Sequence, residues 1–88
     1  MRLIGRLIKN MVITQECDIE LFDDTISYTD LLSRCLVENC RGLDITVPVW
    51  MDKNTKEFVR YKKTFFTQEQ FLETVYFDKF EIQLEKDK

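Results

Sequence analysis

RLIGRLIKNMVITQECDIEL, residues 2–21, has the clearest pattern in the chain and predicts a β-hairpin. Its second half alternates between an apolar side, Met11, Ile13, Cys17, Ile19 and Leu21, and a mostly polar side, Val12, Thr14, Glu16, Asp18 and Glu20. Gln15 is the one break on the apolar side. Alternation over this length is typical of a strand with one buried and one solvated face. Asn10 tolerates a positive φ and suits a turn, so we expect strands at 2–9 and 11–21.

The C-terminal residues repeat this alternation. Phe80, Ile82 and Leu84 face one way, and the other way face Lys79, Glu81, Gln83 and Glu85. This pattern predicts a third strand at 77–85. A two-stranded hairpin is marginal in water without a further strand. We therefore expect the first and last strands to pair.

The residues after the predicted hairpin have the spacing of a helix. Apolar residues recur three or four positions apart at Tyr28, Leu31, Leu32, Cys35 and Leu36. Ser27 and Asp30 form a weak version of a capping box. Gly42 follows, where a helix can end in a left-handed turn. These signals predict a helix over 28–41.

The stretch EFVRYKKTFF, residues 57–66, combines four aromatic and three basic residues and raises the possibility of a nucleic-acid-binding stripe. As a strand it would have two mixed faces. As a helix it gathers its apolar residues within an arc of roughly 160°: Phe58, Val59, Tyr61, Phe65 and Phe66. We therefore expect a helix over 55–64, with its aromatics in the core and unable to stack on bases.

One more helix is expected near the C-terminus. Thr67 and Gln70 have the spacing of a capping box, and Phe71, Leu72 and Val75 form a short apolar stripe. These residues predict a helix over 68–75. Before the 55–64 helix, Pro48 lacks the N–H of a central strand, so the segment around it should be extended or at an edge.

Together these patterns predict an α+β fold in a single small globular domain, residues 1–88. A three-stranded antiparallel sheet (2–9, 11–21, 77–85) should carry helices (28–41, 55–64, 68–75) on one face. The expected core comprises Leu7, Ile13, Ile19, Leu32, Cys35, Leu36, Phe58, Phe65, Phe71 and Ile82.

Charge divides the chain into an acidic and a basic surface. Glu16, Asp18 and Glu20 project from one strand face, and between Lys9 and Arg34 there is no Lys or Arg. The predicted 55–64 helix and its approach carry a basic patch of Lys53, Lys56, Arg60 and Lys63, with Lys62 at its margin. Both surfaces can be solvated faces, or they can contact a partner. Trp50, the only tryptophan, is either a core residue or a contact residue.

Catalytic and metal-binding patterns are missing from the sequence. The chain has no His, and it has no Gly-rich phosphate loop or nucleophile elbow. Asp23 and Asp24 lack the spacing and the Gly of a calcium loop. Cys17, Cys35 and Cys40 show no zinc-ligand spacing, so we interpret them as free thiols, with a reactive thiol as the alternative. We therefore expect that the protein is not an enzyme and that it binds neither a cofactor nor a metal ion.

The cellular location and the kind of partner are inferred from the absence of export and catalytic signals. The apolar runs are too short to span a membrane, and the first ten residues lack the apolar core of a signal peptide. We therefore expect a cytoplasmic, non-enzymatic protein-interaction module, an adaptor or inhibitor that can also self-associate. Its contact would be the sheet edge or the acidic face of residues 12–20. The alternative is a nucleic-acid-binding accessory protein that uses the basic helix face, which the net charge of −3 disfavours.

Overall fold

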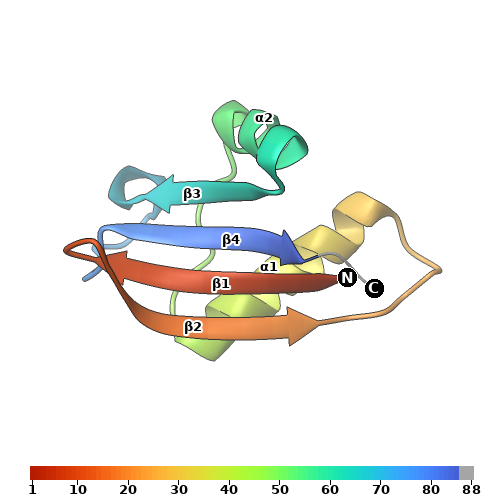
Figure 1. Ribbon diagram of the computed structural model, residues 1–88, viewed down its shortest axis with the longest axis horizontal. Coiled ribbons are helices and arrows are strands. Elements are labelled where there is room, and N and C mark those ends of the chain that lie inside the picture. Colours follow the sequence, from red (N-terminus) through yellow and green to blue (C-terminus); the bar gives the residue numbers. More distant parts are fainter. Residues whose placement is uncertain (86–88) are drawn as a thin grey trace.

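The sheet is built around a central antiparallel pair, β1 and β4, contributed by the two ends of the chain. The computed structural model describes residues 1–85, which form an α+β fold with a four-stranded antiparallel sheet in the order β2-β1-β4-β3 (Figure 1). The elements are β1 (Arg2–Lys9), β2 (Val12–Glu20), α1 (Tyr28–Leu43), α2 (Asp52–Tyr61), β3 (Lys63–Thr67), the 3₁₀ turn η1 (Gln68–Gln70) and β4 (Lys79–Glu85). The predicted pairing of the first and last strands is confirmed.

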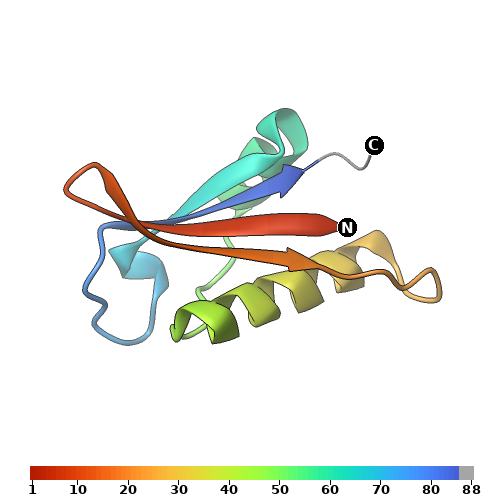
Figure 2. The same cartoon turned by 60° about the horizontal axis from the view of Figure 1, so that its bottom comes forward.

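The two helices lie on one side of the sheet, as expected, and leave the other face open. Figure 2 shows α1 beneath the sheet, where it packs against β1 and β2, and α2 lies beside β3. Leu3 and Leu7 of β1 point into this helix-covered face together with Phe80 and Ile82 of β4, and all four are buried. We call this side the inner face and the solvated side the outer face.

A β-bulge in β2 overturns part of the predicted hairpin pattern. Leu7 pairs with Gln15, but Ile8 pairs with Ile13, so Thr14 is an extra residue on β2. Because side chains alternate with a period of two, one extra residue moves everything before it to the opposite face. Ile13 therefore lies on the outer face and is 54% exposed, not in the core as predicted. The break seen at Gln15 marks this bulge.

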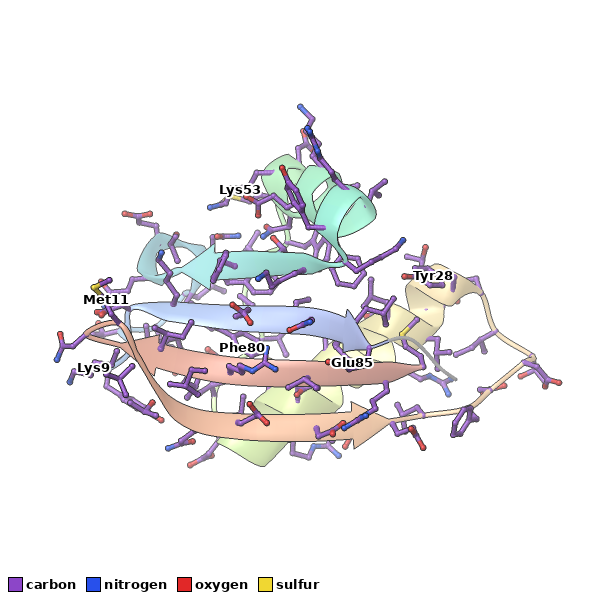
Figure 3. All side chains as sticks on the ribbon, viewed as in Figure 1. Lys9, Met11, Tyr28, Lys53, Phe80 and Glu85 are labelled. Carbon is purple, nitrogen blue, oxygen red and sulfur yellow. The ribbon has the colours of Figure 1, made fainter. Side chains whose placement is uncertain are left out.

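The tip of the hairpin is apolar and exposed. Asn10 and Met11 both adopt positive φ, at 53° and 66°, which is the conformation of a tight hairpin turn. Met11 lies at the tip (Figure 3), and with Val12 and Ile13 it exposes apolar surface at the end of the edge strand β2.

The prediction for helix α1 is correct in position, but the role predicted for Gly42 is wrong. Ser27 caps the helix and accepts a hydrogen bond from the Asp30 N–H at 3.1 Å. The helix continues through Gly42, and the left-handed residue at its end is Asp44, with φ of 57°. Gly42 instead allows close approach of β2, because a Cβ there would lie 2.6 Å from Cys17 Sγ.

The predicted helix over 55–64 is placed three residues too late, and its last residues are a strand. Helix α2 ends at Tyr61, and Lys62 takes a left-handed conformation with φ of 57°. Thr64 and Phe66 then point inward and are buried, whereas Phe65 lies on the outer face and is only half-buried. β3 gains backbone hydrogen bonds to β4, and this pairing overrides the helical spacing of the aromatics.

The predicted helix over 68–75 is only the 3₁₀ turn η1. The capping box at Thr67 and Gln70 is present, since the Thr67 N–H donates to Gln70 Oε1 at 3.0 Å. The turn ends because Gln70 is buried and bonds to another segment, and Phe71 and Phe77 enter the core from irregular backbone. Leu72 is left exposed, so no continuous apolar stripe supports a helix.

A buried amide of Asn54 joins the segments around α2. Its Oδ1 accepts from the Met51 N–H at 2.9 Å and from Gln70 Nε2 at 2.8 Å. Its Nδ2 donates to Thr64 Oγ1 at 2.8 Å and to the Phe65 carbonyl at 2.9 Å. Asn54 therefore uses its full hydrogen-bonding capacity without solvent. It fixes the start of α2, β3 and η1 against one another.

The observed core keeps six of the ten predicted residues. Leu7, Cys35, Leu36, Phe58, Phe71 and Ile82 are buried, and Ile19 and Leu32 pack against them while partly exposed. Ile13 and Phe65 lie outside the core for the reasons above. Much of the additional apolar volume comes from three residues on the C-terminal strands and their connection: Phe66, Phe77 and Phe80.

Gly5 of β1 lies directly against Asn39 of α1. Asn39 is fully buried, and its Nδ2 donates to the Leu3 carbonyl at 3.1 Å and to the Cys35 carbonyl at 3.0 Å. A Cβ at Gly5 would lie 2.6 Å from Asn39 Oδ1 and 2.9 Å from Phe80 Cε1. The absence of a side chain at this position lets α1 sit on the sheet.

We predict that Gly5→Ala destabilises the protein by about 1–3 kcal/mol, the usual cost of overpacking a close contact. Urea unfolding measures this change. Gly42→Ala is the matched control, because its Cβ would also lie 2.6 Å from a heavy atom, the Sγ of Cys17. That atom ends a flexible side chain, and Ala favours a helix by up to about 1 kcal/mol over Gly. Equal destabilisation by both variants would contradict the Gly5–Asn39 constraint.

Two positions on α2, Phe58 and Arg60, give a second stability prediction. Phe58 is buried and contacts Trp50 edge-on, whereas Arg60 is exposed. Phe58→Ala should cost ~3–5 kcal/mol because it leaves a cavity, and Arg60→Ala should cost no more than about 0.5 kcal/mol. Urea melts of the two variants test this. A fully stable Phe58→Ala would show that α2 does not pack as described.

Candidate functional site

The acidic row on β2 is placed as predicted, but arginines neutralise much of it. Glu16 and Asp18 lie on the outer face, where Glu16 is opposite Arg6 and Asp18 is opposite Ile4 and diagonal to Arg2. Arg2 Nε is 2.9 Å from Asp18 Oδ2, and Arg6 Nε is 2.9 Å from Glu16 Oε2. The hydrogen bond from Arg2 lowers the pKa of Asp18. Glu20 pairs in register with Arg2 at the end of the strand.

The Arg6 guanidinium connects three strands across the outer face. Its Nη1 also donates to Glu81 Oε1 at 2.7 Å and to Gln83 Oε1 at 2.8 Å on β4. The side chains of Arg6 and Glu81 are only 18% and 11% exposed. Burial disfavours the charge on Arg6, but hydrogen bonds to Glu16 and Glu81 outweigh this effect and raise its pKa. These residues form a structural network rather than a free acidic surface.

The predicted basic patch is divided between two elements. Lys53, Lys56 and Arg60 are exposed on α2, whereas Lys63 lies on β3 and pairs in register with Gln83 on the outer face. Within residues 1–85, none of the three α2 residues forms an ion pair. The Arg60 guanidinium carbon lies 5.4 Å from the centre of the Tyr61 ring. We call Lys53, Lys56 and Arg60 the basic row of α2.

An apolar groove lies between α1 and α2, next to this row. The groove is open to solvent and has a volume of about 450 Å³, which is within the size range of ligand pockets. Its α1 side is formed by Tyr28, Thr29, Leu32, Ser33 and Leu36, and its α2 side by Thr55, Phe58 and Val59, with Trp50 between them. None of these residues is charged. Figure 3 shows Tyr28 at the start of α1 and Lys53 on α2.

Trp50 combines the two roles considered from the sequence. Its ring packs edge-on against Phe58 and Phe66, with centroid distances of 6.0 and 5.7 Å. Its indole N–H donates to Thr55 Oγ1 at 2.8 Å. The residue remains partly exposed and lines the groove. Trp50 is thus anchored by the core and presents an aromatic surface to whatever enters the groove.

Sequence reasoning missed the groove, although it named Trp50 as a possible contact residue. Tyr28 and Leu32 were assigned to a buried helix stripe, and Val59 to the buried arc of α2. Val59 is in fact 69% exposed, and Tyr61, which was assigned to the same arc, is 62% exposed. The available signal was the width of that arc, because roughly 160° is wider than the stripe of about 100° that a surface helix needs to face a core. The local sequence around Val59 does not show which other helix lies across from it.

Other features restrict the chemistry of the described chain. Up to Glu85, no group of three or more Cys, Asp and Glu side chains is placed to hold a metal ion. No helix in the same residues is both long and apolar enough to cross a membrane. No protein-family model matches the chain, and neither a curated protein nor a solved structure is significantly similar to it.

The three cysteines are free and differ in accessibility. Cys17 is half-buried on β2, and Cys35 and Cys40 are buried in α1. Burial raises the pKa of all three thiols, and it is the main cause in each case. The effect is largest for Cys40, whose pKa rises to about 12 through burial and the nearby Cys17. None therefore has the lowered pKa of a reactive thiol.

We predict that iodoacetamide at about pH 8 labels Cys17 first and slowly in the folded protein. Cys35 and Cys40 should be labelled only after unfolding, since they are buried. Mass spectrometry of digested samples gives the rate at each site, with Cys17→Ser as control. Rapid native labelling of Cys40 would contradict its burial.

Proposed function

We propose that this chain is a non-enzymatic, cytoplasmic protein-interaction module, an adaptor or inhibitor that binds an apolar segment of a partner in the groove between α1 and α2. The observation that carries the proposal is the partly exposed Trp50 between two uncharged helix walls. A large concave apolar surface of this kind is the default binding site of a small domain. Tryptophan is also enriched among residues that dominate binding energy.

A helical or extended peptide fits this surface better than a small molecule, which would need a more enclosed site. The groove is open, and its wall residues Tyr28 and Val59 are more than half exposed. Two helices that flank an apolar channel offer the geometry used to bind amphipathic segments. Hydroxyl groups of Thr29 and Ser33 on the α1 side can bond to polar groups at the edge of such a segment.

Two alternatives have specific support. The basic row of α2, which has no ion-pair partner within residues 1–85, supports nucleic-acid binding. Its contacts with phosphates would weaken steeply as salt rises. Phe58 and Phe66 pack inward and cannot stack on bases. Tyr61 is 62% exposed beside Arg60 and is the one exposed aromatic of this stretch placed to do so. The net charge of −3 opposes binding to a polyanion, so we rank this alternative second. The exposed apolar hairpin tip on the edge strand β2 supports self-association or pairing with a partner strand.

Affinity capture with matched variants tests the proposal. Val59→Glu places a charge in the groove wall, and Val12→Glu places one on the sheet edge; the two valines are 69% and 60% exposed. Both variants should keep wild-type stability, because surface changes rarely exceed about 0.5 kcal/mol. Proteins captured by the wild type from an extract of the source cells should be retained by Val12→Glu and lost by Val59→Glu.

The reverse result would place the contact on the sheet edge, and sedimentation of the Val12→Glu variant would then show whether self-association is lost. Retention of every partner by both variants would overturn the groove proposal. Binding of labelled DNA or RNA at low salt that Arg60→Glu abolishes would favour the second alternative.

A further inference from the structure

The charges around the groove are unequal on its two sides. The α1 wall presents only apolar groups and the hydroxyls of Tyr28, Thr29 and Ser33. On α2, Thr55 and Val59 line the groove, and Lys56 follows Thr55 in the chain. At about 100° per residue, Lys56 projects roughly 60° around the helix from Val59. The basic row therefore begins at the edge of the groove's α2 wall.

The basic row runs along the helix rather than around it. Lys53, Lys56 and Arg60 are spaced by three and four residues, so they lie on one face of α2. With a rise of 1.5 Å per residue, the row spans roughly 10 Å along the helix axis. A segment lying in the groove beside α2 would meet Lys56 first, because Arg60 and Lys53 project roughly 100° and 120° around the helix from Val59.

The helix ends do not add to this positive charge. The first turn of α1 contributes Tyr28 and Thr29 to the wall, but Asp30 in that turn offsets the partial positive charge of the helix N-terminus, and Asp52 is acidic in the first turn of α2. The basic row has no ion-pair partners in the part of the chain that the structure describes, whereas Arg2, Arg6, Arg34 and Arg41 are all paired with carboxylates. The cations beside the groove thus remain available in a protein whose net charge is −3.

We propose that the groove accepts an amphipathic segment of a partner protein with an apolar face and an adjacent acidic face. This inference rests on the proposed function and adds the charge of the partner. Apolar side chains would cover Trp50 and Val59, and carboxylates at helical spacing would face Lys56 and Arg60. Complementary charges would set the orientation of the segment and favour acidic over basic partners.

Three synthetic peptides of about 14 residues test this charge preference. They share one leucine face and carry Glu, Gln or Lys on the adjacent face. Trp50 is the only tryptophan, so its fluorescence reports binding at the groove. We expect the Glu peptide to bind about tenfold more tightly than the Lys peptide at low salt. A tenfold ratio corresponds to about 1.4 kcal/mol, which two exposed ion pairs can supply. The difference should shrink as salt screens the pairs.

Two variants separate the charge inference from the groove proposal. Lys56→Glu combined with Arg60→Glu should reverse the preference toward the Lys peptide, and Val59→Glu should weaken all three peptides. Circular dichroism and urea melts verify that each variant is folded. Equal binding of the three peptides, with no change in the charge-reversed variant, would overturn the acidic-partner inference and leave the groove proposal intact. Absence of binding by every peptide, or binding unaffected by Val59→Glu, would overturn both.

Discussion

The buried amide of Asn54 is the interaction on which the C-terminal half of the structure depends. Its four hydrogen bonds join the start of α2 to β3 and to Gln70 of η1. Gln70 in turn donates to the Val49 carbonyl at 3.0 Å, and the Val49 N–H donates back to the Gln70 carbonyl at 2.7 Å. The segment leading to Trp50 is held by these bonds. In a low-dielectric interior, a fully satisfied polar network specifies one arrangement, because any alternative leaves buried groups unpaired.

This network also explains why Trp50 is a constrained part of a surface rather than a mobile loop residue. The backbone of the preceding residue, Val49, is hydrogen-bonded to Gln70, and the indole N–H of Trp50 donates to Thr55 of α2. Its ring is packed between the core and the groove. A side chain held in this way loses little conformational entropy when a partner covers it. The candidate binding surface is therefore a consequence of the buried polar contacts beneath it.

The other face of the sheet is organised by charge. Arg2 and Arg6 stand between the acidic row of β2 and Glu81 of β4, so opposite charges lie across neighbouring strands. Cross-strand pairs of this kind stabilise a sheet and keep its open face soluble. Basic side chains on α2 have no such partners within residues 1–85. The two charged surfaces seen in the sequence thus differ in character, one being satisfied internally and the other available.

The sequence by itself determined the α+β class, the β1–β2 hairpin, helix α1, strand β4 and part of the core, because each rests on a local period of two or 3.6 residues. It also located Trp50 and the basic residues. Only the tertiary structure decided that residues 63–67 form a strand, since pairing with β4 outweighs the helical spacing of Phe65 and Phe66. Likewise, the bulge at Thr14, the arginine partners of the acidic row and the groove arise from contacts between segments distant in the chain. Periodicity shows which side of an element is apolar, but only packing selects which neighbour covers it and which part stays open.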